Sequence, residues 1–580
     1  MGWPYEIIPD LTAEDKAIRR LTLDAYATYA HLSAYVPVFA YLLYRLGSWA
    51  FGGSSGKSAS YEPVSPSRSH RGRSGLAVAW RRARWWLSEP LSPSGHYGHR
   101  DEWVFGTIWG LWLLTLCVMD TGTDYAHITK RFGLIAASQL PIQTLLSLKF
   151  FNPFARAFGT SHESVNRFHR ALGRVIYLFL LLHVVNYLNL LYLIGRLPGR
   201  LFDDVVVPGE LANLSYTLLF ATALPKVREY SYRLFFITHI FVVFATSFFL
   251  LAHAQPARLY VIKSLVVFIV DLAARKITTA TAQAKIEVVL GTSLIKISAK
   301  LPPGKISQFV EQPGSHAYVS IPWAARPRAL SSLIYEFCFN PFTVADVNPD
   351  SGEVVLVARQ QRGPMTRRLM QLTKEGAGAR VSLCFEGPYG AFAKSYSSLV
   401  DSGVDRVLLV AGGVGASFVL PIYKALKNSN PSAKVELTWA VRLADEASWA
   451  SFSEVTGMNS ISSNTDIFSD RDVRLFVTGE YNGSPDGDSE SIASRSSSVE
   501  MQPLGDRYDL GRGSRPLSYE RGRPDLKQIV DEVFRDENAG SPVAVLVCGP
   551  KEMAISVRRY VTPWVMSGRD VVWHSESFGW

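Results

Sequence analysis

Cysteine is scarce in this chain of 580 residues, and the few cysteines do not form a disulfide scaffold. The four cysteines include no Cys-x-x-Cys pair and no secreted-type framework, and Cys338, Cys384 and Cys548 lie in the second half. We therefore expect a reducing compartment for that half. The first residues, MGWPYEIIPDLTAEDKA, lack the charged and apolar regions of a signal peptide, so the first membrane span is expected to direct insertion.

A surface for nucleic acid is missing as well. The net charge of +10 would suit one, but the Lys and Arg residues collect beside hydrophobic runs instead of forming a patch studded with aromatic residues. We expect no nucleic-acid partner, and we attribute the positive charge to membrane topology.

Long apolar runs are what the first half does contain, and several are near the length of about 20 residues that a helix needs to cross a bilayer. The candidate spans are 26–50, 103–119, 132–148, 171–194, 211–224, 234–254 and 259–273. An Arg-rich segment, 52–102, is expected to be a cytosolic loop, which places the N-terminus outside and everything after residue 275 in the cytosol. The sequence thus predicts an integral membrane protein with seven spans, which we assign to the plasma membrane.

The second half has the patterns of soluble domains. From Lys285, short β-like runs alternate with Gly/Pro turns and predict a small antiparallel β-barrel. After Asp405, strands alternate with helices and predict a parallel nucleotide-binding sheet, interrupted by a Ser/Gly/Arg-rich segment, 482–524, that we expect to be disordered. The predicted domains are a first span with a basic cytosolic loop (1–101), a helical membrane domain (102–275), the barrel (282–395) and the sheet domain (404–580).

Four histidines inside the predicted spans repeat one spacing. Thirteen residues separate His169 from His183 on one span, and thirteen separate His239 from His253 on another. At about 100° per residue, fourteen steps miss four whole turns by only about 40°, so each pair shares a helix face, about 21 Å apart along the axis. Two such helices facing each other would create two His/His sites stacked across the membrane.

This spacing suits haem, because imidazole is a good axial ligand and a bis-His iron favours electron transfer over binding a gas. Zinc would need tighter clusters of ligands. The alternative is four buried histidines that bond to neighbouring helices. Antiparallel spans pair His169 with His239 near the cytosol and His183 with His253 near the outer side. Several arginines near the inner pair either balance haem propionates or anchor the helices at the cytosolic face: Arg167, Arg170, Arg174 and Arg233.

The segments ITKRFGLIAASQLP, NRFHRALGRVIYLFLLLHVV and REYSYRLFFITHIFVV resemble the transmembrane core of the ferric reductase and NADPH oxidase superfamily. The resemblance continues to Trp580, apart from the predicted insertion. It implies a multi-domain membrane protein: an α-helical bundle that binds two b-type haems, an antiparallel β-barrel that binds FAD, and an α/β parallel-sheet nucleotide domain like that of ferredoxin reductases.

The flavin motif of the family is matched by FNPFTVADV, where Phe342 and Thr343 are implied to shape the flavin site. Asn340 stands where the family usually has His, so the flavin is expected to bind differently in detail. The segment RQQRGPMTRRL resembles the pyrophosphate segment, with Gly363 and Thr366 in the matching places. A Gly-Pro turn before a helix start offers backbone N–H groups to phosphate.

The nicotinamide nucleotide is implied to bind at a Gly-rich loop, VAGGVGASFVLP, after an apolar strand. Arg442 matches the position that binds the 2′-phosphate of NADPH, and Cys548 the position beside the nicotinamide. Glu576 would neighbour the hydride path, and Trp580 would stack on the flavin. The further cofactor-binding residues of this half are Gly412, Gly413, Gly415, Gly549, Pro550 and Met553.

The sequence therefore predicts an NADPH-dependent ferric-chelate reductase that carries electrons across the bilayer to ferric or cupric chelates for metal uptake. The alternatives are a superoxide-generating NADPH oxidase and a non-catalytic haem-binding membrane scaffold. The sequence contains no EF-hand-like calcium loop and no large outer domain, which favours the reductase over the oxidase. Four spaced histidines together with Arg442, Cys548 and Trp580 weigh against the scaffold. The oligomeric state is not predicted.

Overall fold

The computed structural model of the protein describes residues 5–8, 11–51, 75–92, 95–326, 335, 337–361, 363–375, 380–392, 395–401, 404–450, 467–479, 519–535 and 541–576. The chain forms two compact units, a helical unit that runs to Thr279 and an α/β unit from Ala280 to Gly579. Trp580, a predicted site residue, lies outside the described residues.

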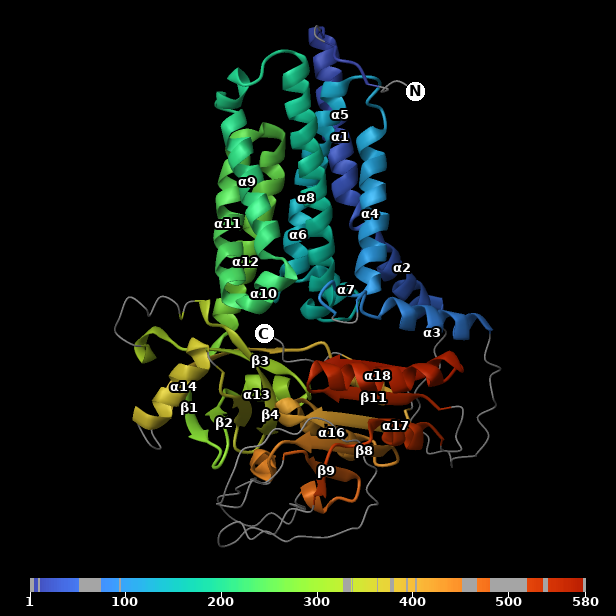
Figure 1. Ribbon diagram of the computed structural model, residues 1–580, viewed down its shortest axis with the longest axis vertical. Helices are drawn as coiled ribbons and strands as arrows, with labels where there is room; N and C mark the ends of the chain where they lie inside the picture. The colour runs from blue at the N-terminus through green and yellow to red at the C-terminus, as the bar shows by residue number, and fades with distance from the viewer. Residues whose placement is uncertain are drawn as a thin grey trace, which may run out of the picture. The chain divides into compact units, whose positions relative to one another are not determined.

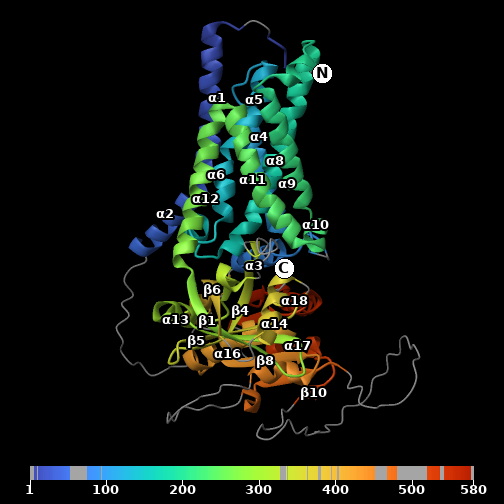
Figure 2. The ribbon, with the colours of Figure 1, turned by 90° about the vertical axis from the view of Figure 1, so that its left-hand side faces the viewer.

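Long helices run side by side in the helical unit (Figures 1 and 2). The described helices are α1 (Ala13–Ser33), α2 (Val36–Phe51), α3 (Gly75–Leu87), α4 (Arg100–Val118), α5 (Tyr125–Ser138), α6 (Leu140–Ser147), α7 (Pro153–Ala157), α8 (His162–Leu193), α9 (Val206–Thr222), α10 (Pro225–Tyr230), α11 (Tyr232–His253) and α12 (Arg258–Thr278). Two of them, α8 and α11, pass a test for spans by both length and apolar composition.

Two of the predicted spans are wrong as single helices. In place of 26–50, α1 begins at Ala13 and the chain turns between α1 and α2, because Pro37 has no N–H to continue the hydrogen bonding of α1. In place of 132–148, the chain forms α5 and α6, which meet at Gln139. The Gln139 side chain accepts from Trp109 Nε1 and donates to the Ala30 carbonyl, so the junction is tied to α4 and α1.

The remaining predicted spans each coincide with one helix, although α8 begins earlier than predicted. The predicted cytosolic loop, 52–102, is described at residues 75–92 and from 95 onward, and part of it is helical. Residues Gly75–Leu87 form the helix α3, and Arg100 already opens α4. Sequence periodicity missed α3 because a helix of 13 residues with Ala, Arg and Trp is too polar to be a span.

The first half of the α/β unit is a closed barrel in which every neighbouring pair of strands is antiparallel. The strands, in their order around the barrel, are β1 (Ala280–Val288), β2 (Leu294–Lys300), β5 (Glu353–Arg359), β4 (Asn340–Asn348), β3 (His316–Ser320) and β6 (Arg380–Tyr389). Alternating residues such as Ala282, Ala284 and Ile286 point into the core, which is why the sequence alternates. Helices α13 (Pro303–Val310) and α14 (Pro364–Glu375) accompany the barrel.

The second half is a parallel six-stranded sheet. Its order is β10 (Glu520–Arg521), β9 (Val473–Val477), β8 (Lys434–Val441), β7 (Arg406–Gly412), β11 (Val543–Cys548) and β12 (Val571–Glu576). The helices of this half are α15 (Tyr396–Asp401), α16 (Ala416–Ser429), α17 (Leu526–Arg535) and α18 (Lys551–Met566). The predicted insertion, 482–524, lies outside the described residues as far as 518, and from 519 onward it contains β10.

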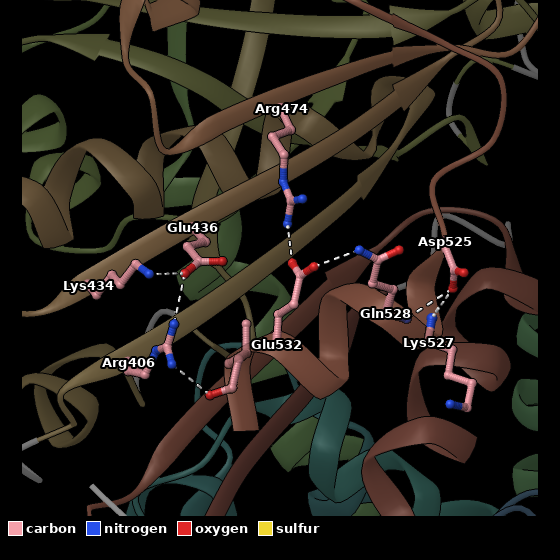
Figure 3. Close-up of polar contacts among 9 residues, drawn as sticks. Arg406, Lys434, Glu436, Arg474, Asp525, Lys527, Gln528 and Glu532 are labelled. Atoms are coloured by element: carbon pink, nitrogen blue, oxygen red, sulfur yellow. Dashed lines mark hydrogen bonds and ion pairs between the residues drawn. The ribbon is translucent and has the colours of Figure 1, made fainter. Parts of the chain in front are cut away.

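A network of charged side chains lies where β7, β8 and β9 begin, at the strand ends opposite the Gly-rich loop (Figure 3). Arg406 donates to Glu436 Oε1 at 3.0 Å and to the Val533 carbonyl at 3.0 Å, and Lys434 reaches Glu436 at 3.0 Å. Burial alone would raise the pKa of Glu436, but the hydrogen bonds and charges of Lys434 and Arg406 outweigh burial and lower it. The network therefore stabilises an ionised Glu436.

We expect this network to make the sheet sensitive to acid. Because the pKa of Glu436 is depressed in the folded state, its contribution is present above the unfolded value of about 4.3 and is lost as pH falls through the folded pKa. Glu436→Gln should cost about 1–3 kcal/mol at pH 7, since it removes the carboxylate charge that Arg406 and Lys434 contact. The rate of amide hydrogen exchange in β7 and β8 peptides measures this loss of stability.

The matched control is Lys434→Gln, because the Lys434 side chain is 54% exposed and its pair with Glu436 should contribute less than about 1 kcal/mol. Equal exchange rates in Glu436→Gln and the parent at pH 7 would contradict the assignment.

Candidate functional site

The four spaced histidines meet in two pairs between α8 and α11. The ring centroids of His169 and His239 lie 6.2 Å apart, and those of His183 and His253 lie 6.3 Å apart. The pairing is the one that antiparallel helices produce when each carries two histidines on one face.

Backbone carbonyls orient three of the four rings. The Nδ1 atoms of His169, His183 and His253 lie 2.8, 2.8 and 2.7 Å from the carbonyl oxygens of Gln143, Thr129 and Val205. A ring that donates from Nδ1 keeps the lone pair of Nε2 for a metal. The Nδ1 atom of His239 is buried and has no hydrogen-bond partner among the described residues.

The geometry of both pairs fits a single metal atom between two imidazoles. A metal bound to an imidazole nitrogen on each side, at about 2.0–2.1 Å, places the ring centres about 6 Å apart. The described residues contain no group of three or more histidine, cysteine or carboxylate side chains that could hold a metal ion. Two ligands per site suit haem, which brings four nitrogens of its own, better than they suit zinc.

Two glycines allow the His183 and His253 rings to lie against neighbouring helices. A Cβ atom at Gly133 of α5 would lie 3.0 Å from the His183 ring, and one at Gly209 of α9 would lie 2.5 Å from the His253 ring. Both glycines are close-contact positions that the sequence analysis missed. Their signal was a glycine inside an apolar helix, which weakens the helix unless close packing requires it.

At the other end of the bundle, two of the predicted arginines form ion pairs with α4. Arg167 pairs with Asp101 at 2.7 Å and Arg170 with Glu102 at 2.8 Å. The guanidinium of Arg174 lies 4.8 Å from the centre of the Trp103 ring. Glu102 is fully buried, and its second carboxylate oxygen has no hydrogen-bond partner among the described residues. Arg167 and Arg170 thus already balance acidic side chains.

The predicted flavin residues lie on the barrel. Phe342 and Thr343 are buried near the start of β4, and His316 of β3 lies opposite Thr343. The Thr366 hydroxyl donates to the Gln361 carbonyl at 2.9 Å and accepts from the Gln361 N–H at 3.1 Å, so it closes the turn that contains Gly363. Helix α14 starts at Pro364, and the free N–H groups of a first helical turn suit a phosphate.

The predicted glycines bring two turns of the parallel sheet into contact. A Cβ atom at Gly415 would lie 2.1 Å from the Cys548 carbonyl oxygen, and one at Gly412 would lie 2.5 Å from Pro550 and 3.1 Å from Met553. A Cβ atom at Gly549 would lie 2.9 Å from the Gly412 nitrogen, and Gly413 has a φ of +55°. The turn after β7 therefore packs on the turn after β11 so closely that a side chain at these glycines would collide.

Cys548 and Glu576 lie opposite each other on β11 and β12. Burial, and then the charge of Glu576, raise the pKa of the Cys548 thiol. Burial would also raise the pKa of Glu576, but a hydrogen bond from His574 (Nε2 to Oε2, 3.1 Å) and the charges of His574 and His316 lower it. The pair therefore combines a neutral thiol with an ionised carboxylate. His574 is a further site residue that the sequence analysis missed.

Arg442 follows β8 and lies beside a cavity of about 330 Å³. Its lining residues are Gly291, Thr292, Ser293, Arg359, Arg442, Leu443, Glu446 and Gly479. Glu446 is 7% exposed, accepts from the Arg442 backbone N–H at 3.2 Å and pairs with Arg359 at 2.8 Å. The Arg442 side chain is exposed and forms no ion pair with the described residues.

The structure thus brings the residues that were predicted to bind the nicotinamide nucleotide together at the carboxyl ends of three adjacent strands. Arg442 follows β8, the Gly-rich loop follows β7 and Cys548 ends β11. Sequence analysis missed Arg359 and Glu446. A carboxylate shortly after the end of a strand was the available signal for Glu446.

Three family models match consecutive parts of the chain. The model for the ferric reductase like transmembrane component matches residues 132–250. The model for an FAD-binding domain matches residues 279–393, and the model for the ferric reductase NAD binding domain matches residues 404–562. The match order is the order of the helical unit, the barrel and the parallel sheet.

Similar fungal proteins carry related names. The chain is 22% identical over 456 residues to the probable metalloreductase AIM14 of Meyerozyma guilliermondii, covering 77% of this chain and 83% of that one. It is 23% identical over 494 residues to ferric reductase transmembrane component 1 of Schizosaccharomyces pombe, covering 77% and 79%. It is 24% identical over 455 residues to ferric/cupric reductase transmembrane component 2 of Saccharomyces cerevisiae, covering 74% and 58%.

Proposed function

Since the chain belongs to the ferric reductase superfamily, we propose that it carries electrons from NADPH, through FAD and two b-type haems, to ferric or cupric chelates on the opposite side of the membrane. The observation that carries this proposal is the pair of facing histidine sites, with ring centroids 6.2 and 6.3 Å apart, on two helices of the helical unit. An oxidoreductase with only a flavin and a nucleotide domain would not need them.

In the α/β unit, the three strand ends divide the work of binding NADPH. Arg442 would hold the 2′-phosphate at β8, the Gly-rich loop would receive the pyrophosphate at β7, and Cys548 would contact the nicotinamide at β11. The neutral Cys548 thiol does not repel the nicotinamide face, and the ionised Glu576 favours the positive charge that the ring gains as hydride leaves. Phe342, Thr343 and the α14 turn would hold FAD, which would supply the conversion of a two-electron hydride into single electrons.

In the helical unit, the carbonyls of Gln143, Thr129 and Val205 fix three of the four imidazoles so that the rings of each pair face one another. His169 and His239 would hold the inner haem, and His183 and His253 the outer one. Haem held by two histidines would supply one-electron transfer. The glycines at 133 and 209 keep the outer rings packed closely, which limits their reorientation.

The proposed topology places the N-terminus outside and the α/β unit in the cytosol of a cell bounded by the plasma membrane, with seven crossings. Basic residues support it: α3 carries Arg81, Arg82 and Arg84, and α10 carries Arg228, on segments assigned to the cytosolic side.

A panel of acceptors tests this function. The purified full chain in lipid discs, loaded with FAD and haem, is given NADPH and then ferric chelate, cupric ion or oxygen. We expect reduction of ferric or cupric chelate to be fastest. Superoxide formation at a higher rate than metal reduction would instead assign the chain to the NADPH oxidases.

We expect Trp580→Ala to bind NADPH more tightly and to reduce the acceptor more slowly. If the indole covers the flavin face that nicotinamide must occupy, it competes with the nucleotide, and its loss delays NADP⁺ release. A terminus without this role would tolerate change. Stopped-flow binding and steady-state turnover measure the two effects. Unchanged values for both would show that Trp580 does not cover the flavin.

A further inference from the structure

Helix α3 has an exposed apolar face that the electron path does not use. Its sequence is GLAVAWRRARWWL. Trp85 is buried, at 6% exposed, whereas Leu76 is 83% and Trp80 68% exposed. A large exposed apolar surface on a helix indicates a binding partner.

The exposed face has an ordered composition. At about 100° per residue, Leu76, Ala79 and Ala83 fall together at its centre. Going outward on each side, a tryptophan comes next and then an arginine: Trp86 and Arg82 on one side, Trp80 and Arg84 on the other. An apolar stripe bordered by tryptophan and then by arginine matches the depth profile of a bilayer surface, from acyl chains to headgroups.

The bundle holds α3 in a suitable direction. The helix extends sideways from the end of the bundle where α4 begins, at a steep angle to α4 (Figure 1). Its exit is fixed, because Leu91 N–H donates to the Gly98 carbonyl and Arg100 N–H to the Glu89 carbonyl, both at 2.9 Å. The Arg100 guanidinium lies 4.8 Å from the centre of the Trp86 ring. A helix so placed at the end of a membrane bundle runs along the membrane plane.

We propose that α3 lies in the membrane interface and binds anionic phospholipid headgroups through Arg82 and Arg84, with Leu76, Ala79 and Ala83 among the acyl chains. Neither arginine has an ion-pair partner among the described residues, so both charges are available to phosphate and carboxylate groups. This surface is independent of the electron path, and its test needs no turnover.

The first experiment measures depth. A spin label is placed at Ala83→Cys in the full chain carrying Cys384→Ser, since the other native cysteines are buried. In lipid discs of phosphatidylcholine and phosphatidylserine, oxygen should relax this label more strongly than a water-soluble nickel chelate does. The control label at Leu290→Cys, a position that is 89% exposed in the α/β unit, should show the reverse. Equal nickel access at the two labels overturns the proposal.

The second experiment tests the charge. Under titration with phosphatidylserine, the ratio of immersed to solvent-exposed Ala83 label should fall about fivefold for each arginine replaced, hence about 25-fold in Arg82→Gln/Arg84→Gln. The control variant Lys300→Gln/Lys551→Gln makes the same charge change at exposed residues of the α/β unit and should match the parent. A parent ratio that is independent of phosphatidylserine, or an equal loss in the control, overturns the proposal.

Discussion

Replacing His183 by alanine is expected to reduce the haem content from two per chain to one and to abolish electron delivery to the acceptor, while NADPH still reduces the flavin. The His183 ring faces His253 at 6.3 Å between centroids, and its Nδ1 atom is held by the Thr129 carbonyl, so the variant lacks one of the two imidazoles of this pair. The reduced-minus-oxidised spectrum, the pyridine haemochrome content and anaerobic flavin reduction measure the three parts of this prediction.

The matched control is His31→Ala. His31 is also buried in the bundle and its Nδ1 atom lies 3.0 Å from the Ser138 carbonyl, but its ring neighbours are Tyr35 and Tyr260 instead of a second histidine. This variant should keep both haems. A His183→Ala protein that retains two haems would contradict the pairing.

A second variant changes the outer site without removing a ligand. Gly209→Val places a branched side chain where even a Cβ atom would lie 2.5 Å from the His253 ring, so the ring must move. We expect loss or weakening of the outer haem alone. Gly199→Val, at a glycine whose Cβ position is open, serves as the control and should bind both haems.

The helical period made the bundle partly predictable. Apolar runs located α4, α8, α9, α11 and α12, because a lipid-facing helix must be apolar over its length whatever its neighbours are. The interruptions were not predicted. The break at Gln139 depends on side-chain bonds to Trp109 and Ala30, which are distant in sequence. Pro37 is the local signal for the break between α1 and α2, because a proline has no N–H to continue the hydrogen bonding of the preceding helix.

Some site residues were predictable from local sequence, and others were not. The fourteen-residue repeat predicted which histidines would face each other, since helix geometry alone converts that spacing into one face. The contacts that shape the sites come from other elements. Gly209 approaches His253 from α9, and Arg359 reaches Glu446 from the barrel. Neither contact follows from local sequence, because each depends on how separate elements pack.

Replacing Arg442 is expected to change the preference of the enzyme for NADPH over NADH. Arg442 is exposed beside the cavity and can form charge-assisted hydrogen bonds with a 2′-phosphate, worth about 1.5–3 kcal/mol. Arg442→Ala should therefore lower the ratio of kcat/KM for NADPH over NADH by about 10- to 150-fold. The effect should come from NADPH, with NADH nearly unchanged.

Glu446 should act in the opposite direction. Its carboxylate lines the same cavity, where it repels a phosphate dianion and also occupies Arg359. Glu446→Gln removes that charge while an amide oxygen can still accept from the Arg442 backbone N–H, so the preference for NADPH should increase by about tenfold, the factor that corresponds to about 1.4 kcal/mol.

In the double variant Arg442→Ala/Glu446→Gln, the released Arg359 should restore part of the lost preference. The two effects would then not add, as expected for residues that share one ligand. The ratio of kcat/KM for NADPH over NADH is measured for the parent and the three variants. An Arg442→Ala enzyme with the parent's ratio would show that the 2′-phosphate does not bind to Arg442.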